Sequence, residues 1–351
     1  MLGDIGLKRP PTYSSAVTRE SIRIAFLIAV LNELDILAAD IGNAYLQAPA
    51  RERVHTTGGP EFGPSRVGQT VIIVRAIYGL KSSGAAWHAQ FSETLHGMNF
   101  KPSLADPDVW YHPACKENGF EYYKYILVYV DDLLAVSHNP SIIMKTIQKA
   151  YRLKEEPTPP KQYLGAVIKQ WSIPNETRPI WAMSAANYIK EAIRCLELEL
   201  SKAGKTLKGK PSTPMQGNYR PELDVSPLLD PEQANYYMSL IGILRWAVEL
   251  GREDIYIDVC LLSSYMCQLR IGHLEQVMHI FAYLKHHKNS NMVFNPNYIT
   301  WESDAFEHYD WSEFYKDAKE QLPPNAPTPR GHVVQINAFI DADHAGNRIT
   351  R

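Results

Sequence analysis

Apolar side chains first recur with the spacing of one helix face shortly after Thr18, a residue type that caps helices, and Glu20 falls in the first turn. This apolar face consists of Ile22, Ala25, Phe26, Ala29 and Val30. Residues 34–41 follow as a short β-prone run with Asp40 near its end. The order predicts a helix that packs on a sheet, preceded by a lead-in segment, residues 1–14, that has no apolar period.

Two adjacent aspartates interrupt the apolar run YVDDLLAV, residues 129–136. Residues 125–130 and 133–136, on either side of them, each predict a strand. A two-residue connection that must turn the chain back favours Asp. We therefore expect Asp131 and Asp132 at the tip of a β-hairpin.

The rest of the chain is first mixed and then helical. A strand is predicted over 70–76, and helices over 85–97, 141–151, 254–269 and 273–288. Two more helices are predicted to start at a Ser184 cap and at a capping box of Asp230, Pro231 and Gln233, the latter helix ending near Gly251. The last helix carries a stripe that predicts core packing: Leu274, Val277, Met278, Phe281 and Leu284.

The two hairpin aspartates are the first candidates for chemistry. Adjacent carboxylates repel each other, so the pKa of each rises unless a cation neutralises the pair. Hard divalent ions such as Mg²⁺ prefer carboxylate oxygens, which makes the tip a candidate metal site. A solvated Asp-Asp turn is the common alternative for this dipeptide.

Composition adds limits but no function. The 351 residues are enough for two or three domains, and 45% hydrophobic with 21% charged residues is typical of a soluble globular protein. Lys and Arg total 36 against 38 acidic residues, so the overall charge does not indicate nucleic-acid binding. The four cysteines have no CxxC spacing, which argues against structural zinc and for a reducing compartment, and we expect them to be buried. No signal peptide opens the chain, and its most apolar run, residues 22–31, is too short to span a bilayer. A soluble, intracellular protein is expected.

Three stretches in this order carry a family resemblance. DIGNAYL, residues 40–46, resembles the motif DVKNAFLNG; IYGLKSSGAAW, residues 77–87, resembles LYGLKQAPRAW; and YVDD resembles the catalytic motif of reverse transcriptases. Residues 161–171 resemble KYFLGIEI, a strand that closes the palm in that family, and residues 333–351 resemble the first strand of a retroelement ribonuclease H domain. The chain is identified as similar to copia-type (Pseudoviridae-like) retrotransposon reverse transcriptases.

The resemblance implies an RNA-directed DNA polymerase site. Asp40, Asp131 and Asp132, with the backbone carbonyl of Ile41, would hold two Mg²⁺ ions, or Mn²⁺ in their place, for nucleotidyl transfer to a primer 3′ end. The residues implied to bind the nucleotide are Tyr45, Ala44, Asn43 and Lys154. Those implied to contact template and primer are Tyr78, Gly79, Lys81 and Tyr129. By the resemblance, Tyr45 excludes a 2′-hydroxyl, although an isolated tyrosine is more often a core residue.

Other positions leave alternatives open. Lys154 could protonate the departing pyrophosphate or be a solvated loop lysine. Ala85 stands where the family has Arg, which puts the template contact there in question. Basic clusters could contact phosphates or be solvated: Lys202, Lys205, Lys208, Lys210, Lys285 and Lys288.

The resemblance also implies the architecture: an α+β fold in which a polymerase palm, an antiparallel sheet backed by helices, carries partial fingers, a helical thumb and connection, and a ribonuclease H stub. The expected boundaries are 1–14 lead-in, 15–183 palm with partial fingers, 184–290 thumb and connection, 291–331 linker, and 332–351 truncated ribonuclease H. Asp341 would be the first carboxylate of that last domain, and hybrid cleavage is not expected.

The implied partners are an RNA or DNA template with primer and deoxynucleoside triphosphates, with no membrane. Integrase, protease and the rest of ribonuclease H are expected in a full-length polyprotein, in a cytoplasmic virus-like particle or the nucleus. The basic strand pair of the family's fingers would lie upstream of residue 1, so weak polymerisation is expected of the chain as written. The alternatives are a catalytically silent nucleic-acid-binding relic and an unfolded pseudogene product.

Overall fold

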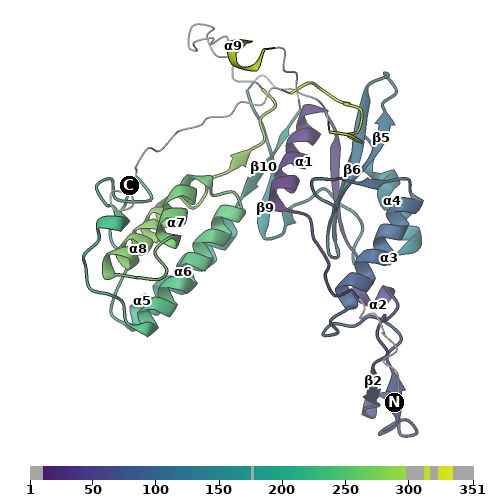
Figure 1. Ribbon diagram of the computed structural model, residues 1–351, viewed down its shortest axis with the longest axis horizontal. Helices are drawn as coiled ribbons and strands as arrows, with labels where there is room; N and C mark the ends of the chain where they lie inside the picture. The colour runs from purple at the N-terminus through teal and green to yellow at the C-terminus, as the bar shows by residue number, and fades with distance from the viewer. Residues whose placement is uncertain (1–10, 175–177, 298–311, 317–322, 335–351) are drawn as a thin grey trace. The chain divides into compact units, whose positions relative to one another are not determined.

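The computed structural model describes residues 11–174, 178–297, 312–316 and 323–334 (Figure 1). The chain divides into two compact units. Unit 1 comprises Met1–Pro159 and Pro296–Gln335, and unit 2 comprises Pro160–Asn295 and Ile336–Arg351. Both units combine helices with antiparallel sheets, which confirms the α+β class.

A five-stranded antiparallel sheet forms the centre of unit 1. Its strand order is β1 (Asp35–Asp40), β7 (Asp132–Ser137), β6 (Glu121–Tyr129), β5 (Val109–Cys115) and β4 (Lys101–Pro102). The predicted strand over 34–41 is therefore β1, and the predicted hairpin is β6 and β7. In the register of β1 and β7, Asp40 lies opposite Asp132.

Helices cover both faces of this sheet. Alternate residues of a strand point to opposite faces. On one face, Ile126, Val128 and Leu133 join a buried cluster with α3 (Ser83–Gly97) and α4 (Pro140–Ala150). The intervening Leu127 and Leu134 are also fully buried, and α1 (Arg19–Leu31) packs on β7. Because both faces are covered there, residues 126–128 of β6 and 133–136 of β7 are continuous apolar runs instead of alternating ones.

The predicted start of α1 is confirmed. The Thr18 hydroxyl accepts a hydrogen bond from the Ser21 backbone N–H, as an N-cap does. Three short elements complete the described part of unit 1 before α3: α2 (Ala44–Gln47), the 3₁₀ turn η1 (Pro60–Phe62), and a ribbon of β2 (His55–Thr57) and β3 (Thr70–Ile72). The helix α9 (Ser312–Tyr315) also belongs to unit 1.

Unit 2 contains a four-stranded antiparallel sheet in the order β11 (Met292–Val293), β10 (Ile180–Ser184), β9 (Ala166–Trp171) and β8 (Gln162–Tyr163). Its helices are α5 (Ala186–Lys202), α6 (Pro231–Glu249), α7 (Tyr256–Ser263) and α8 (Ile271–His286), with 3₁₀ turns η2 (Pro221–Leu223) and η3 (Glu253–Ile255). The predicted capping box of α6 is present: Asp230 accepts from the Gln233 N–H, and Gln233 accepts from the Asp230 N–H.

Three predictions about unit 2 need correction. Residues 161–171 form a hairpin of two strands, because Leu164 and Gly165 both adopt positive φ and turn the chain, and β9 pairs with β10 and not with the five-stranded sheet. The helix predicted over 254–269 is shorter, as η3 and α7. In α8, Ile280 is fully buried whereas Leu274 and Met278 are only partly so, so the buried face lies slightly around the helix from the predicted stripe.

Two further expectations concern the whole chain. All four cysteines are exposed, so the prediction that they are buried was wrong. Among the residues described, no helix is both long enough and apolar enough to cross a membrane. Asp341 and the other residues from 335 onward that were expected to begin a ribonuclease H domain lie outside the described residues.

Candidate functional site: the aspartates at the β6–β7 turn

The turn between β6 and β7 lies one residue earlier than the sequence indicated. Tyr129 pairs with Asp132, so the two turn residues are Val130 and Asp131, and Asp132 is the first residue of β7. Val130 has a φ of +59°, the left-handed region that a β-branched residue rarely adopts. The expectation that Asp131 and Asp132 together form the tip is thereby corrected: Asp131 is in the turn and Asp132 is in the ladder.

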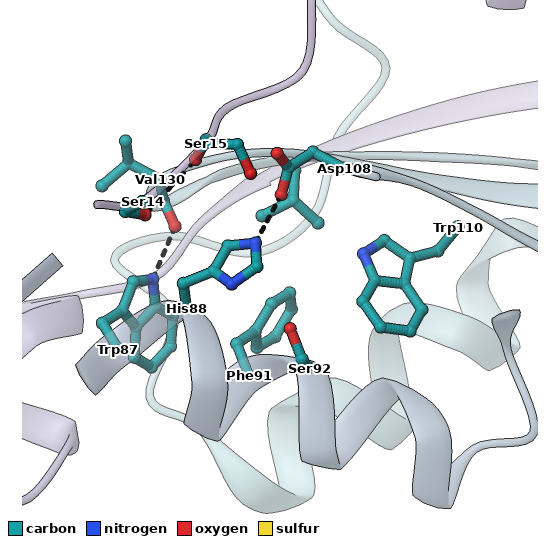
Figure 2. Close-up of a pocket in the computed structure, with 10 residues that line it drawn as sticks. Ser14, Ser15, Trp87, His88, Phe91, Ser92, Asp108, Trp110 and Val130 are labelled. Carbon is teal, nitrogen blue, oxygen red and sulfur yellow. Dashed lines mark hydrogen bonds and ion pairs between the residues drawn. The ribbon is translucent and has the colours of Figure 1, made fainter. Parts of the chain in front are cut away.

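Neighbouring segments hold both carbonyl groups of this turn. The Trp87 indole N–H donates to the carbonyl of Val130 over 2.6 Å (Figure 2). The backbone N–H of Ile41 donates to the carbonyl of Asp131 over 2.9 Å. The second bond joins the end of β1 to the turn, which keeps Asp40 beside Asp131 and Asp132.

Lys154 lies with these carboxylates. Its Nζ is 2.6 Å from Asp40 Oδ2 and 3.9 Å from Asp131 Oδ2. Its backbone N–H donates to the Asp40 carbonyl over 2.9 Å, so the main chain also fixes it beside β1. Half of the Lys154 side chain is exposed, yet it is paired, which disfavours a freely solvated loop lysine.

Burial and neighbouring charges shift the pKa values of Asp131 and Asp132. Burial raises the pKa of Asp131, the nearby Asp40 raises it further, and Lys154 opposes the shift. Burial, followed by Asp131 and Asp40, raises the pKa of Asp132 to about 6. The hydrogen bond to Asp40 raises the pKa of Lys154, so its ammonium stays charged at neutral pH. The negative charges of Asp40, Asp131 and Asp132 therefore favour a cation beside these carboxylates.

The chemistry of these side chains suits a hard divalent cation. Carboxylate oxygens are the ligands that Mg²⁺ prefers, and Asp40 Oδ1 is buried with no hydrogen-bond partner among the described residues. In the part of the chain that the structure describes, no three or more His, Cys, Asp or Glu side chains lie close enough together to hold a metal ion. Lys154 is the cation that meets Asp40 and Asp131 here, so the donors fit the metal but are not preassembled around one.

The predicted nucleotide residues lie just beyond β1. Asn43 has a φ of +50° and precedes α2, in which Ala44 is fully buried. The Tyr45 ring is half-buried with its centroid 4.6 Å from that of Tyr78. Burial, then Tyr78 and Asp131, raise the pKa of Tyr45. Tyr45 is therefore neither a simple core residue nor remote from the aspartates.

The predicted template and primer residues divide into two groups. Tyr78 is 65% exposed, Gly79 turns the chain at a φ of +98°, and Lys81 is exposed, all in the segment before α3. Tyr129 instead lies at the end of β6, paired with Asp132. Ile41, whose carbonyl was proposed as a ligand, is fully buried.

Three residues that support the site had no recognisable signal in the sequence. Trp87 was noted only as part of the IYGLKSSGAAW match, and Val130 only as the end of a strand. The Trp87–Val130 bond spans 43 residues, and no local pattern signals such a contact. Glu52 was also missed: its Oε1 accepts the Ser82 backbone N–H over 2.9 Å just before α3 begins.

With this arrangement described, comparison with known proteins identifies the class. A family model described as reverse transcriptase (RNA-dependent DNA polymerase) matches residues 7–207, more than half of the chain. The chain therefore belongs to the reverse transcriptase family, and the identification as a copia-like retrotransposon reverse transcriptase region is confirmed.

Named relatives agree with this family. The chain is 26% identical over 288 residues to the retrovirus-related Pol polyprotein from transposon TNT 1-94 of Nicotiana tabacum, covering 80% of this chain and 20% of that protein. It is 27% identical over 315 residues to the Pol polyprotein from transposon RE1 of Arabidopsis thaliana, covering 88% and 20%. A Ty1-DR5 Gag-Pol polyprotein of Saccharomyces cerevisiae is 22% identical over 309 residues, covering 84% and 17%. The chain thus spans about a fifth of the length of these relatives.

Proposed function

We propose that this chain carries the polymerase site of a retrotransposon Pol polyprotein, with Asp40, Asp131 and Asp132 as its metal-holding carboxylates. The observation that supports this most is the register that sets Asp40 opposite Asp132, next to Asp131 in the turn. Asp40 precedes Asp131 by 91 positions and Asp132 by 92, and three negative groups are not normally gathered at one strand end without a cationic ligand.

The three carboxylates would hold two Mg²⁺ ions, which Mn²⁺ could replace. When bound, such ions lower the pKa of the primer 3′-hydroxyl and stabilise the charge of the leaving pyrophosphate. The contribution of the protein is to place the carboxylates correctly, while Lys154 opposes the rise in pKa of Asp131 and Asp132. The bonds from Ile41 to Asp131 and from Lys154 to Asp40 fix the backbone beneath two of them.

Lys154 would act on the triphosphate. Its ammonium is protonated at neutral pH and carries a transferable proton on Nζ. We infer that Lys154 leaves Asp40 when cations occupy the carboxylates and then faces the phosphates, where it offsets their charge or donates a proton to the leaving group. Tyr45, Ala44 and Asn43 would form the floor of the nucleotide site, and Tyr78, Gly79, Lys81 and Tyr129 would contact template and primer.

The arrangement of domains is part of the proposal. The five-stranded sheet of unit 1 would be the palm, the β2–β3 ribbon part of the fingers, and the helices of unit 2 the thumb and connection. The substrates of this site would be a primed RNA or DNA template and deoxynucleoside triphosphates. Because the relatives are Pol polyproteins, integrase, protease and the remainder of ribonuclease H would accompany this region in a full-length protein.

Primer extension on a primed RNA template tests the proposal. We expect Mg²⁺- or Mn²⁺-dependent extension that Asp131→Asn reduces at least about a hundredfold, since the loss of an essential charged ligand costs several kcal/mol. Glu117→Gln is the matched control, because Glu117 is exposed in the β5–β6 turn, at the other end of β6. Extension that Asp131→Asn leaves unchanged would refute the assignment. Template binding without any extension, in wild type as in Asp131→Asn, would favour the silent binding relic instead.

A further inference from the structure

The turn before Asp131 is strained. Val130 is non-glycine and β-branched, and its φ of +59° costs on the order of 1–3 kcal/mol unless neighbouring contacts impose it. Such a conformation persists only where the surrounding structure determines it. The question is therefore which contact holds Val130.

Trp87 makes the contact that fits. Its indole N–H donates to the Val130 carbonyl over 2.6 Å, a short hydrogen bond, and its side chain is 1% exposed. Figure 2 shows the indole directed from α3 to the Val130 oxygen. The Trp87 ring is packed against Phe91 and against the edge of Tyr151, with centroid distances of 5.3 Å to each.

The next residue of α3, His88, anchors the helix to β6 through Asp108. His88 Nε2 lies 2.8 Å from Asp108 Oδ1 (Figure 2). The Asp108 carbonyl accepts the Val128 N–H over 3.0 Å. The cavity among these side chains is only about 10 Å³, no more than one water molecule could occupy, so the indole has little room to turn away. Trp87 is thus a fixed donor on a fixed helix.

The two carbonyl contacts together set the direction of the Asp131 side chain. The Val130–Asp131 peptide is held through the Val130 oxygen by Trp87, and the next peptide is held through the Asp131 oxygen by Ile41. When the peptide planes on both sides of a Cα are fixed, its Cα–Cβ direction is fixed as well. The position of the Asp131 carboxylate then depends only on its side-chain torsions.

We propose that Trp87 is a positioning residue for Asp131: its indole N–H keeps Val130 in the positive-φ conformation that presents the Asp131 carboxylate beside Asp40. The inference rests on the proposed function of these aspartates as metal ligands, but the effect on the turn itself does not. Trp87 touches no reacting atom and acts through the backbone.

The test uses the full chain and Trp87→Phe, which keeps an aromatic ring but removes the donor. Two measurements are made: Mn²⁺ affinity by electron paramagnetic resonance, and amide hydrogen exchange at residues 130–132 without metal. We expect Trp87→Phe to weaken Mn²⁺ binding and to speed exchange at the turn, each by about tenfold, the equivalent of one lost hydrogen bond. Trp110→Phe is the matched control, since Trp110 is buried against the same cavity but makes no contact with Val130 among those found.

A second background separates positioning from packing. Glycine adopts positive φ at no steric cost, so in Val130→Gly the same Trp87→Phe change should alter Mn²⁺ affinity by less than about threefold. The inference would be overturned if Trp87→Phe had the Mn²⁺ affinity and amide exchange of wild type, or if Trp110→Phe lost as much Mn²⁺ affinity as Trp87→Phe. It would also be overturned if Trp87→Phe weakened Mn²⁺ binding as much in Val130→Gly as in wild type. Faster exchange at the turn in a protein whose Mn²⁺ binding does not depend on Asp131 would instead refute the proposed function and leave the role of Trp87 in the turn intact.

Discussion

At the scale of single residues, the site is a balance between like charges and one lysine. Asp40 and Asp131 side chains are 36% and 26% exposed, so water screens their repulsion only partly. Lys154 offsets this repulsion through its 2.6 Å contact with Asp40, and the backbone bond from Lys154 to Asp40 keeps it there. Stability near this turn should consequently depend on pH and on added cations.

Asp132 gives the clearest pH dependence. Its pKa rises from 3.8 to about 6 in the folded chain because burial and the other aspartates disfavour its charge. A raised carboxyl pKa contributes stability that is fully present below the unfolded pKa, about 4, and is lost as pH rises through about 6. We expect Asp132→Asn, which cannot ionise, to raise the free energy of unfolding by about 1–2 kcal/mol at pH 8 without divalent ions, discounted for partial exposure.

Chemical denaturation at pH 4 and pH 8 checks this expectation. The difference in free energy of unfolding between Asp132→Asn and wild type should nearly vanish at pH 4, where wild-type Asp132 is itself protonated. Glu117→Gln, which changes an exposed carboxylate away from the turn, should show no such difference between the two pH values. An advantage that is the same at both pH values would show that charge is not its cause.

Tyr45 carries the prediction on sugar selection. Its ring lies against Tyr78, and Asp131 is close enough to affect its pKa, so its bulk sits at the proposed nucleotide site. Tyr45→Val removes that bulk and should raise the incorporation of ribonucleotides relative to deoxynucleotides by at least about tenfold, a steric penalty of 1–2 kcal/mol relieved. Tyr45→Phe keeps the ring and should discriminate as wild type does. Parallel primer-extension rates with the two nucleotide types measure the ratio, and an unchanged ratio in Tyr45→Val would remove Tyr45 from this role.

At the scale of elements, β1 is an edge strand that the chain covers. Ala38 exchanges two backbone hydrogen bonds with Thr158, and the Gly42 N–H donates to the Arg152 carbonyl. The segment after α4 therefore runs along the outer edge of β1, which protects that edge from pairing with another chain. The same segment brings Lys154 to Asp40, so edge protection and the placement of the lysine have one structural cause.

A second segment of unit 1 comes from far along the chain and packs on β6 and the α1–β1 loop. The Gly331 N–H donates to the Glu121 carbonyl, the Tyr123 hydroxyl to the Thr328 carbonyl, and the His332 N–H to Asn32 Oδ1. Arg330 also forms an ion pair with Glu121 at 2.8 Å. Residues 328–332 are thus a strap on β6 and the α1–β1 loop, although they lie about 200 residues beyond β6 in sequence (Figure 1).

Gly331→Ala should loosen the strap. Gly331 has a φ of +89°, and a Cβ there would lie 2.6 Å from Asn32 Oδ1, so the substitution adds both strain and a clash. We expect amide exchange at residues 331 and 332 to quicken about tenfold or more through local opening. Gly119→Ala is the control, because Gly119 has a φ of +85° but no atom within 4 Å of its Cβ position. Equal exchange at the strap in both variants would show that the Asn32 contact does not hold it.

At the scale of the whole chain, the residues that match the reverse transcriptase family, 7–207, belong to both compact units. Unit 1 contains the candidate site in full, since Asp40, Asp131, Asp132, Lys154, Tyr45 and Trp87 all precede Pro159. The core of unit 1 reaches directly under the turn: Ile41, Trp87, Leu133 and Tyr151 share one buried cluster. Substitutions in this core therefore act on the site as well as on stability.

The sequence by itself determined what depends on neighbours within a few residues. The Thr18 cap, the Asp230–Gln233 capping box, β1 and the β6–β7 hairpin were predicted from local pattern, because caps and strands draw on adjacent residues. The sequence also shows directly that Asp131 and Asp132 are adjacent acidic residues. Asp40 became a candidate only through the family resemblance, since nothing in its own neighbourhood marks it.

Only the tertiary structure decided the register and the contacts that follow from it. Both faces are buried at residues 126–128 of β6 and 133–136 of β7, so no alternation of apolar and polar residues fixes where the turn falls. The predicted turn was therefore displaced by one residue. The turn falls at Val130 and Asp131, where Trp87 and Ile41 donate hydrogen bonds to its two carbonyl groups. Lys154 reaches Asp40 across 114 residues of sequence. Such contacts join segments whose separation along the chain carries no periodic signal, and they form only when helices and strands pack together.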